Sequence, residues 1–189
     1  MGAIGTKPLT IEEFDKLDLP RGWELRNGEL VQVTFPVVIH RDLQLRISDL
    51  FRQAFPNAHV LPEYPFQIEQ TNDKRSADVG MTTMERGLAS RQKGILSGAP
   101  EVVVEVLSPS NDLAQLKRDR RVYFAHGMLI FLQVDPDDNT IEVYRKNEKS
   151  VAILTLGDTL GISWLGEEKT ISVNAVFQGI TIPEGTEHA

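Results

Sequence analysis

Two stretches of the chain carry apolar residues at the spacing of an amphipathic helix. The first covers residues 37–55, ends just before Pro56, and places His40 in its opening turn. Its apolar stripe consists of Leu43, Ile47, Leu50, Phe51 and Ala54. The second stretch covers residues 112–126 and is expected to stop at Gly127. We expect both to form long helices packed on a sheet.

The N-terminal region predicts a short helix followed by a β-hairpin. Thr10 and Glu13 have the spacing of a capping box, in which two side chains satisfy the first N–H groups of a helix, and this helix should end near residues 19–20. Residues 23–26 and 29–33 are short apolar runs separated by Asn27 and Gly28. This pair of residues is the strongest short-range signal for a hairpin turn.

Further strands are expected along the rest of the chain. Runs typical of strands cover residues 58–61, 65–69, 77–81, 129–134 and 140–145, with turns at residues 72–73 and 136–139. Residues 85–93 are polar and fit either a short helix or a loop. Residues 151–180 should contain a strand, a turn at residues 157–158 and a short helix near residues 173–177, and residues 181–189 should form a loose tail.

One strand differs from the others because it is apolar almost throughout. Residues 102–107 are aliphatic except for Glu105, which is typical of a strand buried on both faces. A strand, a helix and a further strand form a crossover unit, so the sheet should be mixed and carry packed helices. We therefore expect an α/β or α+β fold with a mixed β-sheet core flanked by helices. It should form a single domain over residues 1–189, with its core at about residues 20–180.

Composition narrows the classes of function. No apolar run approaches the roughly 18 residues of a membrane span, residues 1–8 lack the apolar core of a secretory signal, and cysteine is absent. These features favour a cytoplasmic protein without disulfides or thiolate metal sites. The net charge of −7 argues against binding nucleic acid through bulk electrostatics, so only a local basic patch could bind DNA. Residues 117–121 are the densest candidate, although a solvated helix face explains them equally well.

A carboxylate within an apolar strand needs a partner. Glu105 must be neutralised, paired or bound to metal, because a buried unpaired charge costs several kcal/mol. Asp78 has a similar setting between Ala77 and Val79. Two such acids on neighbouring strands would suit Mg²⁺ (or Mn²⁺), since Mg²⁺ takes one or two carboxylates and keeps water molecules. A strand-end glutamate satisfied by the backbone or by an arginine is the alternative for Glu105.

Several motifs occur in an order that is similar to that of a known family. They cover residues 23–30, His40, and residues 75–79, 100–110, 123–127, 134–136 and 157–160. With these motifs the chain resembles the PD-(D/E)XK superfamily of restriction-endonuclease-like folds and, more narrowly, the bacterial Uma-two family, which is abundant in cyanobacteria. The resemblance implies a restriction-endonuclease-like fold and a Mg²⁺-dependent endonuclease that hydrolyses phosphodiester bonds of DNA.

The resemblance also implies roles for individual residues. Asp78 and Glu105 would hold the metal, Glu24 would be an additional acid of the site, and His40 would be a nearby polar or substrate-contacting group. In such enzymes the metal polarises the scissile phosphate and lowers the pKa of the attacking water, while a lysine orients that water. From the residues alone, Glu24 could equally be an exposed hairpin acid, and His40 an ordinary histidine on a helix face. A homodimer would let such an enzyme address both strands of a duplex.

The sequence departs from this pattern at the lysine. The usual position, two residues after Glu105, is Leu107, and the family's alternative position in the following helix is Asp119. At about 100° per residue, one stripe of that helix should face the sheet. The stripe would contain Leu113, Leu116, Lys117, Arg120, Tyr123 and Phe124, while Arg118 and Val122 would point away. Lys117 and Arg120 are therefore candidates for the catalytic cation, and Arg118 and Arg121 for substrate binding.

Two functions from different classes remain open. The first is a metal-dependent DNA endonuclease that uses Asp78, Glu105 and Glu24 with Lys117 or Arg120. The second is a catalytically degenerate nuclease-fold protein that acts as a nucleic-acid or protein interaction module, with its carboxylates paired to Lys117 or Arg120. The substitution Asp119→Lys should create or increase cleavage if the first is correct. A hydrolase of another phosphate ester is a third, weaker hypothesis.

Overall fold

The computed structural model describes residues 7–20, 22–32, 38–108 and 111–180. Several predicted features lie outside these ranges. They are the first six residues, residue 33 of the second hairpin strand, residue 37 at the start of the first long helix, residues 109–110 after the apolar strand, and the tail at residues 181–189.

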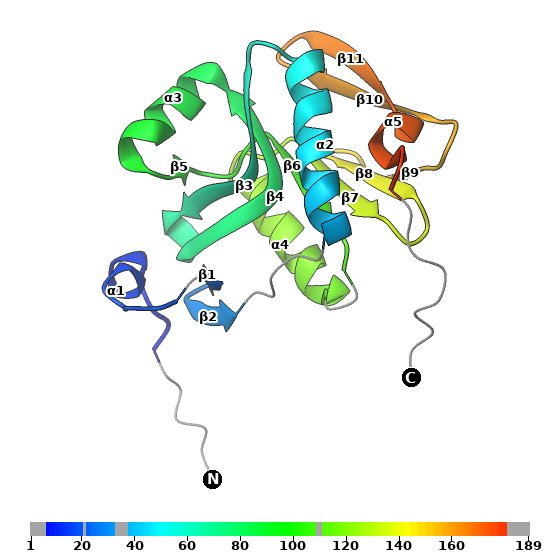
Figure 1. Cartoon of the computed structure of the whole chain (residues 1–189). Coiled ribbons are helices and arrows are strands. Elements are labelled where there is room, and N and C mark those ends of the chain that lie inside the picture. The colour runs from blue at the N-terminus through cyan, green and yellow to red at the C-terminus, as the bar shows by residue number, and fades with distance from the viewer. Residues whose placement is uncertain (1–6, 21, 33–37, 109–110, 181–189) are drawn as a thin grey trace, which may run out of the picture.

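A mixed β-sheet of nine strands, counted over the described residues, forms the centre of the fold (Figure 1). Its main path follows the order β2-β1-β4-β6-β7-β8-β9, and β3 pairs with β4 and β5. The strands are β1 (Trp23–Arg26), β2 (Glu29–Gln32), β3 (Ala58–Ile68), β4 (Asp73–Thr83), β5 (Leu96–Ser97), β6 (Val102–Val106), β7 (Ile130–Asp135), β8 (Thr140–Arg145) and β9 (Ala152–Leu154). Strand β6 is antiparallel to β4 and parallel to β7. The predicted mixed sheet with the apolar strand inside it is confirmed.

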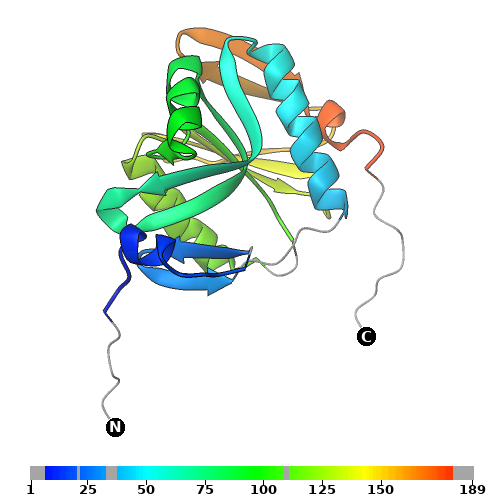
Figure 2. The ribbon, with the colours of Figure 1, turned by 60° about the vertical axis from the view of Figure 1, so that its left-hand side comes forward.

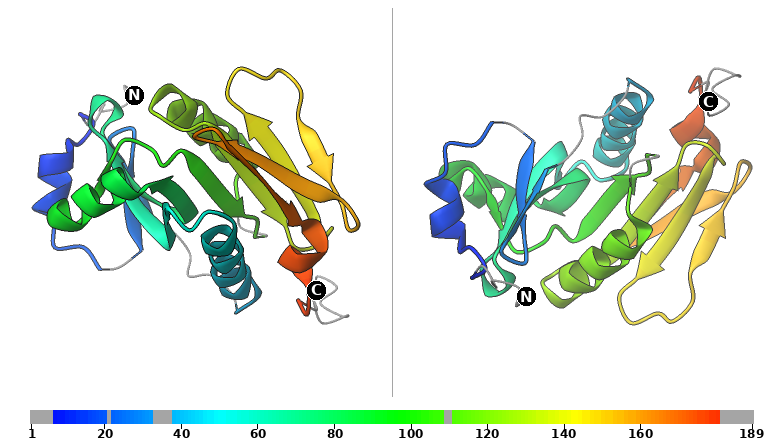
Figure 3. Two further views of the ribbon diagram at one scale, coloured as in Figure 1. Left: turned by 90° about the horizontal axis from the view of Figure 1, so that it is seen from above. Right: turned by 90° about the horizontal axis from the view of Figure 1, so that it is seen from below.

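Helices cover both faces of this sheet. Helix α2 (Val38–Ala54) lies on one face and α4 (Leu113–Ala125) on the other (Figure 3). The α2 face is also covered by α5 (Val173–Phe177) and by the separate hairpin of β10 (Thr159–Trp164) and β11 (Glu167–Ser172). The shorter elements are α1 (Ile11–Asp15), the 3-10 helix η1 (Glu69–Thr71) and α3 (Met84–Lys93).

The two faces of β6 pack against different cores. The stripe Leu43, Ile47 and Phe51 of α2 is almost completely buried and packs in one cluster with the β6 residues Val102, Val104 and Val106. Burying one side chain of this size contributes about 1.5–3 kcal/mol relative to leaving it exposed. Val103 belongs to the opposite cluster with Tyr123 and Phe131. Because alternate residues of a strand point to opposite faces, Glu105 lies on the α4 side with Val103.

The N-terminal predictions are confirmed. Thr10 and Glu13 form the capping box at the start of α1, although the helix ends at Asp15, earlier than expected. Strands β1 and β2 form the hairpin around Asn27 and Gly28, whose φ angles of 50° and 78° suit a tight turn of this kind. Figure 2 shows this hairpin beside the β3 and β4 pair, and one backbone pair joins it to β4.

The structure corrects two other expectations and decides a third that the sequence left open. Residues 58–69 form one long strand, β3, rather than two, because most of β3 lies at an edge of the sheet where the missing N–H groups of Pro62 and Pro65 are tolerated. The ambiguous residues 85–93 belong to helix α3, and Thr83 accepts a hydrogen bond from the backbone N–H of Arg86 at its start. Residues 159–172 form a hairpin of two strands, where the sequence pattern indicated one strand.

The described helices include none that is long and apolar enough to cross a membrane.

Candidate functional site

Asp78 and Glu105 lie at the same level of two neighbouring strands. Val79 of β4 pairs with Val104 of β6 at the end of their antiparallel ladder. Asp78 precedes Val79 and Glu105 follows Val104, so the antiparallel direction brings the two acids to the same end of the ladder. The sequence prediction that these acids lie on neighbouring strands is therefore matched by the strand register.

Three donors hold the carboxylate of Asp78. The backbone N–H of Val106 donates to Oδ2 at 2.7 Å, and the side-chain amide of Gln44 donates to Oδ1 at 2.8 Å. His40 Nε2 lies 3.1 Å from Oδ2. Helix α2 supplies both His40 and Gln44, because residues four apart lie on one face of a helix.

The backbone opposite Asp78 is irregular. Pro62 and Tyr64 of β3 pair with Val79 and Ala77, which places Glu63 across from Asp78. Glu63 has a φ of 47°, a conformation that is uncommon for a residue other than glycine. Such backbone strain often occurs at functional sites. The regular ladder is thus interrupted at the level of the two acids.

Glu105 lies in surroundings that oppose its negative charge. Burial raises the pKa of Glu105 well above its ordinary value, and the negative charges of Asp78 and Glu24 raise it further. Arg26 acts in the opposite direction but does not outweigh them. The excess of negative charge means that a cation placed beside Glu105 would be strongly attracted.

His40 is coupled to the same group of acids. Burial lowers the pKa of His40, but the hydrogen bond and the charge of Asp78 outweigh burial, so the pKa is raised above 6.5. The Nδ1 atom of His40 is buried and has no hydrogen-bond partner among the described residues. His40 therefore lies next to the paired acids, as the resemblance implied, and its observed contact is with Asp78.

Glu24 reaches the site from the hairpin, together with Arg26. Both oxygens of the Glu24 carboxylate accept hydrogen bonds: Oε1 from the backbone N–H of Ser76 at 3.0 Å, and Oε2 from Arg26 Nε and Nη2 at 3.0 and 2.9 Å. The side chain of Glu24 is only 12% exposed, so it is not the exposed hairpin acid of the alternative interpretation.

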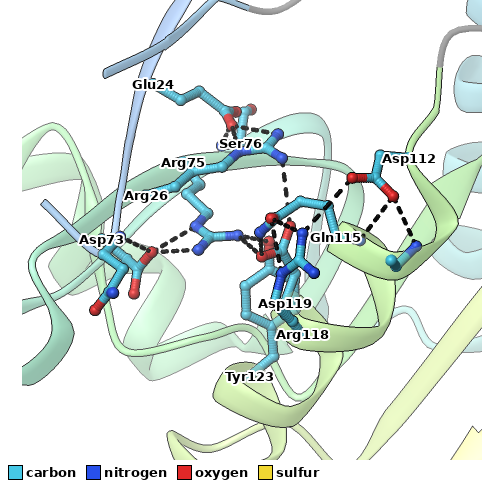
Figure 4. A network of polar contacts seen from close by, with 12 residues as sticks. Glu24, Arg26, Asp73, Arg75, Ser76, Asp112, Gln115, Arg118, Asp119 and Tyr123 are labelled. Carbon is cyan, nitrogen blue, oxygen red and sulfur yellow. Dashed lines mark hydrogen bonds and ion pairs between the residues drawn. The ribbon is translucent and has the colours of Figure 1, made fainter. Parts of the chain in front are cut away.

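Asp119 is the centre of a buried network of charges (Figure 4). Its Oδ1 lies 2.5 Å from Arg75 Nη1 and accepts from Gln115 Nε2 at 2.6 Å, and its Oδ2 lies 3.4 Å from Arg26 Nη1. Arg75 also donates to Asp73 through Nε at 2.7 Å. Asp119, the acid at the expected lysine position, is thus paired with two arginines, Arg26 of β1 and Arg75 of β4.

The predicted inward stripe of α4 was wrong in part. The buried residues of the helix are Leu116, Asp119 and Tyr123, whereas Leu113 is 61% exposed. The centre of the inward face is therefore rotated toward Asp119. The reason is that Asp119 is neutralised by Arg75, a partner on β4 that helical spacing alone cannot reveal.

Of the four cations predicted on α4, Lys117, Arg118 and Arg121 are exposed on the helix surface, whereas Arg120 is half-buried. Arg120 stacks on the ring of Tyr144, with its guanidinium carbon 3.5 Å from the ring centre. Arg118 donates to Gln115 at 2.6 Å. Their roles as catalytic or substrate-binding residues stay predictions.

The residues present suit a divalent cation with oxygen ligands. Asp78 and Glu105 offer carboxylates in a negatively charged setting, and Mg²⁺ needs only one or two carboxylates in addition to water. Across the described part of the chain, the geometry includes no group of three or more histidine and acidic residues arranged to hold a metal. The fit therefore rests on a two-carboxylate site.

Sequence reasoning did not select Gln44, Arg26 or Arg75. Gln44 could have been found from its spacing of four residues from His40, and Arg26 from its spacing of two residues from Glu24, which places both on one side of a strand. The pairing of Arg75 with Asp119 had no sequence signal, because the two residues lie on different elements and meet only in the fold.

A family model described as "Putative restriction endonuclease", Uma2, matches residues 11–183. The match covers most of the chain. The chain belongs to the Uma2 family. Both the predicted family and the predicted restriction-endonuclease-like fold class are thereby confirmed.

The fold of this Uma2 protein is also similar to a solved structure. That structure is titled as a putative nuclease belonging to DUF820 from Anabaena variabilis ATCC 29413. The TM-score is 0.79 with 19% sequence identity, and the comparison covers 92% of this chain and 100% of the other. At this identity the likeness shows a common fold. The comparison with proteins of curated function finds no match.

Proposed function

We propose that this Uma2 protein is a Mg²⁺-dependent endonuclease that hydrolyses phosphodiester bonds of DNA. The observation that carries the proposal is the pairing of β4 with β6, which brings Asp78 and Glu105 to the same end of their ladder. Burial and the charges of Asp78 and Glu24 raise the pKa of Glu105 there. A protein keeps such a charge arrangement at a cost in stability, and strongly perturbed groups of this kind cluster at functional sites. Membership of the Uma2 family supports the same conclusion.

In this proposal Asp78 and Glu105 hold the metal. When bound there, Mg²⁺ or Mn²⁺ supplies a Lewis acid that polarises the scissile phosphate and lowers the pKa of a bound water. The backbone N–H of Val106 and the amide of Gln44 fix the orientation of the Asp78 carboxylate. Glu24 is the additional acid, and its Oε1 accepts one hydrogen bond, from Ser76, and keeps a second lone pair for a metal.

The proposal is tested first by metal binding without DNA. Saturating Mn²⁺ should raise the melting temperature of the wild type, since a ligand at about 100 times its Kd adds ~2.7 kcal/mol of stability. The increase should be absent in Asp78→Asn and Glu105→Gln and unchanged in Asp49→Asn, which alters a surface ion pair on α2. Without metal, Glu105→Gln should be at least as stable as the wild type at neutral pH, because glutamine is uncharged and the surroundings of Glu105 oppose its ionised form.

Cleavage is the second test. A mixture of supercoiled plasmid, linear duplex and single-stranded DNA should be cut by the wild type with Mg²⁺ or Mn²⁺, and neither Asp78→Asn nor Glu105→Gln should cut it. Full activity in either variant, or Mn²⁺ binding that survives both substitutions, would contradict the proposal. Cleavage of other phosphate esters but no DNA would favour the weaker third hypothesis.

One observation favours the non-catalytic alternative. Glu24 and Asp119 are already neutralised by Arg26 and Arg75, as in a structural salt-bridge cluster. The partners are not the Lys117 or Arg120 of the sequence-based hypothesis. An interaction module predicts no hydrolysis with any metal and DNA or protein binding that does not depend on Glu105. A homodimer and a cytoplasmic location stay predictions, and light scattering after gel filtration tests the first.

A further inference from the structure

Arg26 occupies an unusual position among the cations of the molecule. It lies on β1 two residues after Glu24, with the fully buried Leu25 between them. Because alternate strand residues share a face, Leu25 anchors the hairpin in the core while Glu24 and Arg26 point to the other side, where Arg26 contacts Asp119 and Glu24 contacts the backbone of Ser76. The side chain of Arg26 remains 24% exposed.

Two acids orient the guanidinium of Arg26. Glu24 Oε2 accepts from Nε and Nη2, at 3.0 and 2.9 Å, and Asp119 Oδ2 lies 3.4 Å from Nη1. Each terminal nitrogen of an arginine carries two N–H groups, so with the described residues as partners both retain one N–H for a further acceptor. Asp119 in turn is held by Arg75 and Gln115, which gives it a fixed position.

The other cations near the network are engaged or lie elsewhere. The side chain of Arg75 is 2% exposed and bound by Asp73 and Asp119, so solvent and substrate cannot reach it. Arg120 is stacked on Tyr144. Lys117 is exposed on α4. Glu24, which holds Arg26, also accepts a hydrogen bond at 3.0 Å from the backbone N–H of Ser76, two residues before Asp78 on β4, so the pair lies close to the Asp78 strand position.

We propose that Arg26 binds the phosphate of the nucleic-acid substrate beside Asp78 and Glu105, and that Glu24 and Asp119 are positioning residues that aim its guanidinium. This inference rests on the proposed nuclease function and deepens it. A guanidinium presents paired N–H groups that match two oxygens of a phosphate, and it stays charged at any working pH. It stabilises negative charge on the phosphate and does not transfer a proton. The cation of the site thus comes from the N-terminal hairpin and not from α4.

The experiment compares Arg26→Met, Arg26→Lys and Arg26→Ala with the wild type, and uses Arg52→Met, a surface position on α2, as the control. In Mg²⁺ or Mn²⁺, Arg26→Met should lose about a hundredfold or more in kcat, as for removal of one group that stabilises transition-state charge. Arg26→Lys should recover only part of the loss, because lysine lacks the paired geometry. Guanidinium ions at low concentration should partly restore Arg26→Ala, which a merely structural role does not explain.

Two further readouts separate this inference from the proposed function. The Mn²⁺-induced rise in melting temperature should persist in Arg26→Met, since Asp78 and Glu105 are intact. Binding of a short fluorescein-labelled DNA duplex in Ca²⁺, measured by anisotropy, should weaken at least tenfold in Arg26→Met and stay unchanged in Arg52→Met.

The outcomes are distinct. If the wild type cuts DNA and Arg26→Met cuts it equally well, the inference is overturned and the proposed function stands. If the wild type cuts no DNA, the proposed function fails and the binding measurement alone decides: equal affinity of the wild type and Arg26→Met overturns the inference, and a selective loss supports it. Loss of activity without guanidinium rescue, together with unchanged DNA affinity, also overturns it.

Discussion

Replacing Asp119 tests how strongly the buried network depends on its central acid. The side chains of Asp119 and Arg75 are 4% and 2% exposed, and their charged atoms lie 2.5 Å apart. Removing one partner of a buried ion pair typically costs about 3–5 kcal/mol, because the other charge stays buried. Arg75 keeps Asp73, so Asp119→Asn should cost about 3 kcal/mol, at the lower end of that range.

Asp119→Lys should be more damaging than Asp119→Asn. A lysine at this position would lie beside the guanidinium groups of Arg75 and Arg26, so like charges would be buried together. The loss should exceed about 5 kcal/mol, which is a large part of the roughly 5–15 kcal/mol that stabilise a typical protein. The structure therefore reverses the expectation from sequence that Asp119→Lys creates cleavage: the variant should be poorly folded.

The assay is urea unfolding followed by circular dichroism, supported by melting temperatures. A loss of 3 kcal/mol corresponds to a drop of about 6–12 °C at this chain length. Asp49→Asn is the control, since its ion pair with Arg52 is exposed and should contribute about 0–1 kcal/mol. In a double-mutant cycle, Asp119 should couple more strongly to Arg75 than to Arg26. A loss in Asp119→Asn no larger than that of Asp49→Asn would refute the reasoning.

Three further predictions concern other parts of the molecule. Burial lowers the pKa of His59 below 6.5, and Arg91 and Arg52 add to the effect. The unfolded chain therefore takes up this proton first as the pH falls, so the wild type should lose stability below about pH 6.5. The unfolding free energy of His59→Asn should depend less on pH over the same range. Gly87→Ala would place a Cβ 2.1 Å from His59 Cγ and should cost about 1–3 kcal/mol, whereas Gly161→Ala, which meets nothing within 4 Å, should be nearly neutral. Thr10→Ala removes the capping box of α1. Amide hydrogen exchange in α1 should become faster by a factor that corresponds to about 1 kcal/mol. Equal exchange rates in the variant and the wild type would show that the cap does not stabilise the helix.

The His59 prediction depends on a buried hydrogen bond between His59 and Tyr64. His59 Nδ1 lies 2.8 Å from the hydroxyl of Tyr64, and the ring is 5% exposed. Protonating the ring would place a charge beside Arg91 and Arg52. A wild-type stability curve as flat as that of His59→Asn between pH 7 and pH 5 would contradict the assigned cause.

The resemblance and the residue pattern located the two central acids, but they did not reveal which residues contact those acids. Asp78 and Glu105 could be selected because carboxylates in short apolar strands are unusual. Whether each is paired depends on neighbours from distant parts of the chain. Asp78 meets Gln44 and His40 of α2, whereas the negative charges of Asp78 and Glu24 act on Glu105.

The sequence by itself determined the features that depend on near neighbours. These are the capping box at Thr10, the hairpin turn at Asn27 and Gly28, the two long helices and the apolar strand around Glu105. Each follows from periodicity or turn chemistry within a few residues, so the local sequence is enough to predict it.

Only the tertiary structure decided which charges meet. Helical spacing predicted that Arg120 faces the sheet, and its guanidinium does pack on Phe131 and Tyr144. The same spacing could not show that Asp119 is buried as well, because its partner Arg75 lies on β4. The same applies to Arg26, which reaches the site because Leu25 beside it is anchored in the core. Long-range pairing of charges offsets the desolvation of each group, and no periodicity in the sequence records that balance.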